Sequence, residues 1–216
     1  MSTAAPDRVP ALPPVVSRAE WAEARAALMT EEKALTRALD RLAAQRRRLP
    51  MERFDPSYSL AGPDGSRTLL DLFEGRQQLA VYQFMDVGPD SFCPGCTWLT
   101  KNVTALPELA ANGVSWATVS EMPLAQMESY WEQQGWDVPF YSSRGTTFAA
   151  DCGVDGGFML SMFLRDGAEV YRTWNTTSRG VDRLLFVNNL LDLAVYGRQE
   201  DWEDSPEGWP QQPTYG

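Results

Sequence analysis

The sequence contains no histidine, only three cysteines and no long apolar run, and each of these shortages argues against a class of protein. A structural zinc site takes about four Cys or His ligands, which three cysteines without histidine do not supply. Three is also an odd number, unlike the paired cysteines of a secreted disulfide framework. No stretch approaches the ~18 apolar residues of a membrane-spanning helix. We therefore expect no metal and no membrane partner.

Positive charge is also scarce. The 216 residues carry 19 Lys and Arg against 29 Asp and Glu, a net charge of −10. A nucleic-acid partner is not expected, because phosphate binding requires a basic surface. The basic cluster Arg46-Arg47-Arg48 is better placed to complement the dipole at a helix end. Residues 1–10 show neither a basic start nor a continuous apolar run, so we expect no export signal and a cytoplasmic location.

Two of the three cysteines form the tetrapeptide Cys93-Pro94-Gly95-Cys96. The apolar run 79–85 before it predicts a buried strand, and residues 97–110 behind it predict a helix. Strand, short loop, CxxC and helix is the arrangement of a thioredoxin-like dithiol site. The alternative is a pair of structural cysteines that happen to stand three positions apart.

The chain divides into four predicted parts: a disordered Pro/Ala-rich segment over 1–16, an amphipathic helix over 17–49, a domain over 50–196 and an acidic, aromatic tail over 197–216. Ser17 and Glu20 match a capping box at the start of the helix. Apolar residues recur every seven positions along it, at Trp21, Leu28, Leu35, Leu42 and Leu49. This stripe predicts packing either on the chain's own domain or on a second subunit, which would make a homodimer.

The predicted elements of the domain alternate between strand and helix. They are a hairpin around 62–65, a short helix at 69–73, strand 79–85, the CxxC helix, strand 114–120, helix 123–135, a hairpin over 157–174 and a helix at 181–193. This order favours an α/β fold with a central mixed sheet and helices on both faces.

The sequence resembles an uncharacterised bacterial family of the thioredoxin-like superfamily, near the alkyl hydroperoxide reductase and thiol-specific antioxidant proteins. The resemblance covers roughly residues 30–216 and depends on dispersed motifs: Leu49-Pro50, Gly62-Pro63-Asp64-Gly65, Asp71-Leu72-Phe73, Gly75-Arg76, Tyr82-Gln83-Phe84-Met85 before the CxxC, Ser142-Ser143, Gly145, Arg179-Gly180-Val181-Asp182, Asn189-Leu190-Leu191-Asp192, Gly197-Arg198 and Trp209-Pro210 to Tyr215. It implies a thioredoxin-like fold and antioxidant thiol chemistry. We expect no bound cofactor.

Two positions depart from better-known relatives of this superfamily. Thioredoxins usually carry a cis-proline before the strand that faces the CxxC, where this chain has Asp155-Gly156-Gly157-Phe158. Peroxiredoxins use a proline, a threonine and a cysteine at fixed spacing, but here Cys93 follows Pro89 by four positions and the threonine is missing. The first departure alters substrate docking, and the second weakens a peroxidase assignment.

The expected chemistry follows from the position of the motif at a helix start. Cys93 would be the exposed nucleophile and Cys96 the resolving thiol. Pro94 suits the first helical position, and the N–H groups of Gly95 and Cys96 are candidate donors to a Cys93 thiolate. The nearby carboxylates of Asp86 and Asp90 oppose that thiolate. We therefore predict a modestly lowered pKa and a couple closer to thioredoxin than to a strong oxidant.

Four more residues have two interpretations each. Asp86 is either a proton shuttle for Cys96 or a solvated loop carboxylate. Arg179 is either an electrophilic partner of the sulfur site or a surface residue that caps the following helix region. Trp98 shields the motif from water or fills the core. Cys152 is a small buried residue or a second resolving thiol.

Three functions compete at this stage. The first, which we favour, is a thiol-disulfide oxidoreductase that uses Cys93 and Cys96 on a protein or small-molecule disulfide. The second is a thiol-dependent peroxidase with Cys93 as its peroxidatic residue. The third is a non-catalytic thioredoxin-fold binding module, for which both cysteines would be dispensable.

Overall fold

The computed structural model describes residues 12–154 and 156–211, so most of the segment predicted to be disordered lies outside the described residues. The chain divides into two compact units, with the boundaries at Leu49/Pro50 and Leu193/Ala194. One unit contains the first helix and the C-terminal segment, and the other is the domain between them. Over the described ranges, no helix is both long and apolar enough to cross a membrane.

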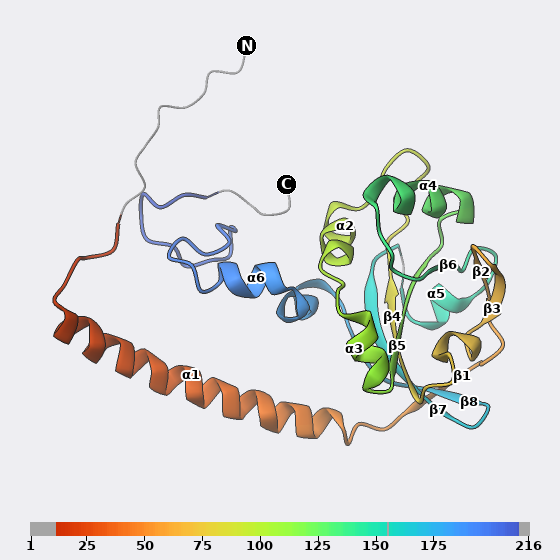
Figure 1. Cartoon of the computed structure of the whole chain (residues 1–216), viewed down its shortest axis with the longest axis horizontal. Helices are drawn as coiled ribbons and strands as arrows, with labels where there is room; N and C mark the ends of the chain where they lie inside the picture. Colours follow the sequence, from red (N-terminus) through yellow and green to blue (C-terminus); the bar gives the residue numbers. More distant parts are fainter. Residues whose placement is uncertain (1–11, 155, 212–216) are drawn as a thin grey trace, which may run out of the picture. The chain divides into compact units, whose positions relative to one another are not determined.

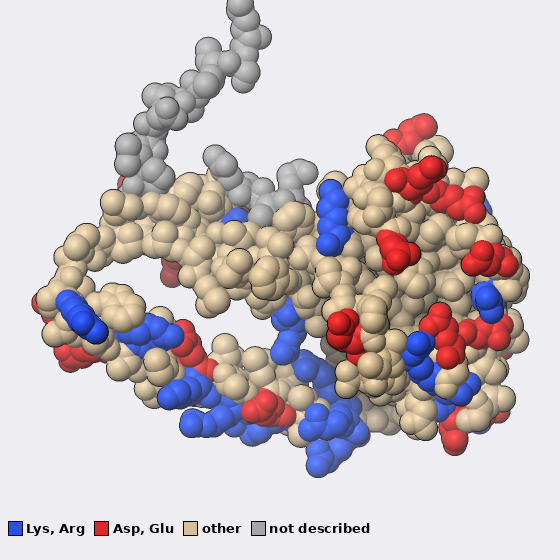
Figure 2. Space-filling model, viewed as in Figure 1, with Lys and Arg blue, Asp and Glu red and all other residues tan. Residues whose placement is uncertain are grey.

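Helix α1 spans Arg18–Arg46 and begins with the predicted capping box. Ser17 N–H donates to Glu20 Oε2 at 2.9 Å, and Glu20 N–H donates to Ser17 Oγ at 3.3 Å. None of its side chains is buried, and Trp21 of the apolar stripe is 61% exposed. Figure 2 shows Lys and Arg side chains gathered toward the C-terminal end of α1. Which surface covers the stripe, its own domain or a second copy, stays a prediction.

The second unit is built on one eight-stranded mixed sheet (Figure 1). Its spatial order is β1-β8-β7-β4-β5-β6-β2-β3. Strands β4, β5 and β6 run parallel, whereas the other neighbouring pairs are antiparallel. The strands are β1 Glu52–Phe54, β2 Ser59–Gly62, β3 Gly65–Thr68, β4 Gln78–Gln83, β5 Val114–Ser120, β6 Phe140–Ser142, β7 Met159–Asp166 and β8 Glu169–Thr176.

Helices connect these strands and cover both faces of the sheet. They are the 3-10 helix η1 Asp71–Phe73, then α2 Pro94–Lys101, α3 Leu106–Ala111, α4 Leu124–Gln134, α5 Phe148–Asp151, the 3-10 helix η2 Ser178–Leu184 and α6 Phe186–Leu191. The central order β8-β7-β4-β5, with α2 in the crossover from β4 to β5 and a β7–β8 hairpin, is the thioredoxin-like arrangement. The predicted fold class is therefore confirmed.

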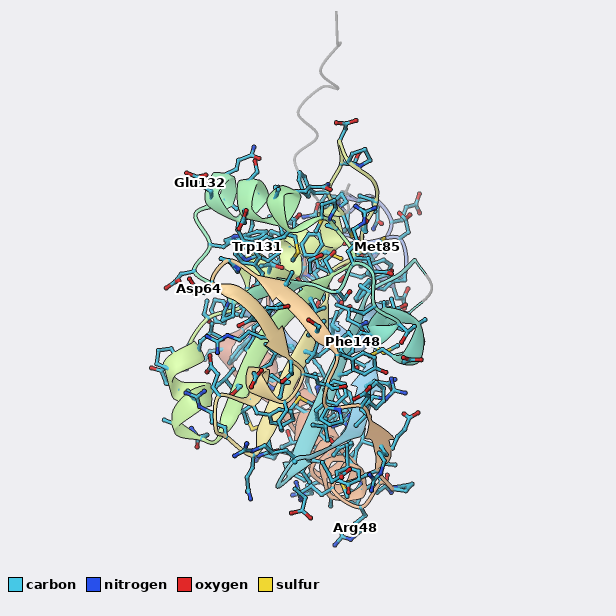
Figure 3. The ribbon with its side chains drawn as sticks, turned by 90° about the vertical axis from the view of Figure 1, so that its right-hand side faces the viewer. Arg48, Asp64, Met85, Trp131, Glu132 and Phe148 are labelled. Carbon is cyan, nitrogen blue, oxygen red and sulfur yellow. The ribbon has the colours of Figure 1, made fainter. Side chains whose placement is uncertain are left out.

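Alternation along β4 divides the core into two clusters. Leu79 and Val81 face a cluster closed by η1 and α5, which includes Phe148. Tyr82 faces the second cluster, closed by α2, α4 and η2, which includes Trp131. Figure 3 labels Phe148 and Trp131. Successive side chains of a strand point to opposite faces of the sheet. A central strand that is buried on both faces is therefore a continuous apolar run in the sequence.

Two predicted helices are broken in the structure. The helix expected over 97–110 ends at Lys101 and restarts at Leu106, because Pro107 lacks an N–H and its ring clashes with an uninterrupted preceding turn. The helix expected over 181–193 is interrupted at Leu185, whose backbone is extended with φ −93° and ψ 111°. Leu185 is buried in the second cluster, so its packing outweighs local helix propensity.

Three short elements were not expected from the sequence: β1, β6 and α5. β1 and β6 contain three residues each and α5 contains four, too few for periodicity to appear. β1 is held by pairing with β8, and β6 by pairing with β5 and β2. Their formation therefore depends on partners distant in the sequence.

Candidate functional site

The turn from β4 into α2 places Cys93 at the N-cap of that helix. Pro94 occupies the first helical position, where a missing N–H costs nothing. Cys96 N–H donates to Cys93 Sγ at 3.3 Å, and Thr97 N–H donates to Cys93 O at 2.9 Å. Cys93 is half-buried and Cys96 fully buried, and neither is in a disulfide. Cys93 is therefore the more accessible of the two thiols.

The surroundings of Cys93 favour its thiolate form. Its pKa is lowered to about 6, first by the hydrogen bond from the Cys96 thiol and then by the backbone N–H groups of Cys96 and Gly95. Partial burial of Cys93 acts in the opposite direction. At neutral pH the group is therefore mainly thiolate, the form that attacks a disulfide.

The surroundings of Cys96 favour its protonated form. Its hydrogen bond to Cys93 and its burial both raise its pKa well above the ordinary thiol range. The backbone N–H of Met85, a loop residue labelled in Figure 3, donates to Cys96 Sγ at 3.4 Å. This hydrogen bond lowers the pKa of Cys96 and so offsets part of the increase. The two thiols thus have opposite preferences, as an attacking thiol and a resolving thiol require.

Tyr82 is a site residue that the sequence reasoning missed. Its fully buried hydroxyl makes no hydrogen bond of ordinary geometry, but it lies close enough to Cys96 Sγ for each group to shift the other's pKa. Burial first, and then the Cys96 sulfur, raise the pKa of Tyr82 well above its usual value. The signal was strand alternation, since β4 turns Tyr82 toward the face that α2 covers.

Asp86 lies in the loop between β4 and α2. Its carboxylate accepts a hydrogen bond from Gly88 N–H at 2.9 Å. It is not among the groups that shift the pKa of Cys96. It also lines a small hollow with Gln83 and Ser120. The loop-carboxylate interpretation fits this position.

Trp98 ties α2 to the C-terminal helices. Its indole Nε1–H donates to Asn188 Oδ1 at 2.9 Å, and Asn188 is fully buried. The ring is half-buried and packs against the second cluster. Trp98 therefore fills core and orients α2, the helix that carries the dithiol.

Replacing Trp98 with phenylalanine is expected to lower the free energy of unfolding by about 1–3 kcal/mol, because buried Asn188 Oδ1 loses this donor while most of the ring area stays. Urea unfolding of the reduced protein measures the effect. Trp202→Phe, at an exposed tryptophan in the other unit, is the matched control. An unchanged midpoint for Trp98→Phe would contradict the role given to this hydrogen bond.

Arg179 lies in η2, with its side chain 62% exposed. Its Nε is 3.5 Å from Asp182 Oδ2, one turn further on. Both residues also line a pocket to which Gly95 of the dithiol segment contributes. Arg179 is thus both a surface residue paired within its own helix and a neighbour of the motif.

Cys152 is separated from the dithiol by the sheet. It is buried in the first cluster, whereas Cys96 belongs to the second. Burial raises the pKa of Cys152 to about 12, and its carbonyl accepts a hydrogen bond from Arg172 Nη1 at 2.6 Å. Its position fits a buried structural residue. In the part of the chain that the structure describes, no cluster of three or more acidic or thiol side chains is placed to hold a metal.

Comparison with solved structures finds proteins of low identity. Peroxidoxin BcpB from Mycobacterium tuberculosis is 19% identical, with 62% of this chain and 94% of that one aligned at a TM-score of 0.47. A putative thiol:disulfide interchange protein DsbE from Chlorobium tepidum is 15% identical, over 60% and 86% of the two chains, with a TM-score of 0.45. PrxQ from Xylella fastidiosa is 15% identical, over 65% and 93%, also at 0.45. No curated protein matches the sequence.

A family model identifies the chain more firmly. The model described as a bacterial protein of unknown function (DUF899) matches residues 10–215, nearly the whole sequence. The expected membership of a bacterial family is confirmed, and the thioredoxin-like fold follows from the strand order described above. The chain belongs to the DUF899 family of bacterial proteins.

Proposed function

We propose that this protein is a thiol-disulfide oxidoreductase with Cys93 as nucleophile and Cys96 as resolving thiol. The observation that carries the proposal is that the pKa values of two neighbouring thiols are shifted in opposite directions. The pKa of half-buried Cys93 is lowered to about 6, while that of buried Cys96 is raised. Two structural cysteines that merely filled core would need neither the N-cap position nor this asymmetry.

The reaction proceeds in two exchanges. The Cys93 thiolate attacks one sulfur of a substrate disulfide, forms a mixed disulfide and expels the other half as a thiolate, which takes a proton from water. Cys96 then loses its proton and attacks Cys93 Sγ, which closes the Cys93–Cys96 disulfide and releases the second half as a thiol. The protein is oxidised by two electrons and the substrate reduced by two. A separate thiol donor must then reduce the protein.

The reduction potential of the Cys93–Cys96 couple tests this function directly. A stabilised Cys93 thiolate favours the reduced state, so we expect a value between about −270 mV, as in thioredoxin, and about −180 mV, as in protein disulfide isomerase. Equilibration in graded thiol buffers, followed by alkylation and mass analysis, measures it. Cys152→Ala is the control, because that thiol lies on the other face of the sheet. Failure to form a reversible Cys93–Cys96 disulfide at any poise would refute the proposal.

A further inference from the structure

A pocket of about 240 Å³ adjoins the dithiol. Gly95, between the two cysteines, forms part of its wall, and Tyr82, which meets Cys96, forms another part. Leu99 of α2 and Leu185 at the end of η2 complete two more sides. The pocket is open to solvent on one side, so a group attached to a substrate disulfide can enter it beside the dithiol.

The chemistry of the walls favours an apolar occupant. Leu99, Val181 and Leu185 are buried aliphatic side chains, and half-buried Phe158 adds an aromatic wall. An apolar group that covers these walls removes apolar surface from water, which favours its binding. A short alkyl or aryl group is of suitable size and polarity.

The charges around the pocket favour an occupant without net charge. Arg179 and Asp182, which both line it, form an ion pair with each other at 3.5 Å. The chain as a whole carries a net charge of −10, which repels anions such as glutathione disulfide. A disulfide with neutral, apolar substituents is not repelled by the net negative charge of the chain. It also needs no charged partner in the pocket, where Arg179 and Asp182 already pair with each other.

Resting on the oxidoreductase function above, we propose that this pocket holds an apolar substituent of the substrate, so that the protein selects disulfides whose sulfur carries a neutral alkyl or aryl group. Gly95 has open space where a Cβ would stand, which allows the substituent to approach the motif. Cys93 attacks the adjoining sulfur and forms the mixed disulfide R–S–S–Cys93, while RS⁻ leaves and is protonated. Cys96 then releases the second RSH.

The first test is the rate at which the reduced full-length protein reacts with diethyl, dipropyl and dibutyl disulfide, compared with bis(2-hydroxyethyl) disulfide. The rate constant is expected to rise by up to about fourfold for each methylene that enters the pocket. A parallel series uses disulfide-bridged peptides with Leu or Ser beside the cysteine. A gradient in the alkyl series indicates small organic substrates, and one in the peptides alone indicates protein substrates. Equal rates across both series overturn the proposal.

Variants locate the selectivity. Val181→Phe is expected to fill the pocket and flatten the gradient, whereas Phe158→Ala should extend it to longer chains. Phe140→Ala changes another half-buried aromatic residue of the same cluster outside the pocket, so it should keep the wild-type gradient. An unchanged gradient in both pocket variants would place the selectivity elsewhere.

A binding measurement separates this proposal from the proposed function. Dibutyl sulfide has no disulfide to reduce, and calorimetry can follow its binding to the Cys93→Ser/Cys96→Ser double variant. If dibutyl sulfide binds and Val181→Phe weakens this binding, the pocket proposal is supported. If the protein then reduces no disulfide, only the oxidoreductase function fails. Absence of binding at millimolar concentrations overturns the pocket proposal, whatever the protein does to disulfides.

Discussion

Replacing Cys93 with serine is expected to abolish disulfide reduction, with a loss of about a thousandfold or more. The structure gives Cys93 a thiolate at neutral pH, whereas a serine hydroxyl at the same N-cap stays protonated and is a poor nucleophile toward sulfur. The measurement is steady-state reduction of a model disulfide with a thiol donor. The Cys152→Ala variant should retain turnover, since Cys152 is buried on the opposite face of the sheet.

Cys96→Ser is expected to react once and then stop. The first exchange needs only Cys93, so the substrate's thiol half should remain bound as a mixed disulfide that mass analysis detects. Peroxide distinguishes the alternative function, because a peroxidase that needs only Cys93 would still consume one equivalent of peroxide in this variant. Wild-type turnover by Cys96→Ser would refute the resolving role. Undiminished function with both cysteines replaced would favour a binding module instead.

Ionisation of Cys93 is expected to have its midpoint at about pH 6, followed through the ultraviolet absorbance of the thiolate. The largest cause of this low pKa is the hydrogen bond from the Cys96 thiol, so Cys96→Ala should raise the midpoint. If the pKa returns to an ordinary value near ~8.5, the thiolate fraction at pH 7 falls about thirtyfold. Cys96→Ser, which retains an O–H donor, should lie between the two.

The sign of the stability effect follows from the same shift. A thiol whose pKa is lower in the folded than in the unfolded protein stabilises the fold in its thiolate form. This contribution is fully present above the unfolded value and is lost as the pH falls through about 6. A midpoint for wild-type Cys93 that equals that of the Cys96→Ala variant would contradict the assigned cause.

Local patterns predicted much of the fold. β5 spans Val114–Ser120, the predicted residues, because it is rich in β-branched and aromatic residues and is preceded by Asn112-Gly113, a turn signal. The Ser17–Glu20 capping box and the Gly135 end of α4, with φ 67°, were also predictable. Each depends on residues within about four positions of one another.

Elements that depend on distant partners were not predictable in this way. β1 and β6 exist because β8, β5 and β2 supply their hydrogen bonds. The break at Leu185 follows from burial of that side chain in the second cluster. Local sequence patterns do not show which distant residues will pair with a short strand or bury a given side chain, so these elements could not be predicted from the sequence.

The sequence by itself determined the chemistry available: two thiols three positions apart at a strand-to-helix turn, with no histidine to share in it. Only the tertiary structure decided what surrounds them. It brought Tyr82 to Cys96, buried Cys152 on the opposite face of the sheet, and placed η2 beside Gly95 to form an open, largely apolar pocket. The physical reason is range, since turn and cap preferences act within a few residues, whereas burial and thiol pKa depend on side chains that only folding brings together.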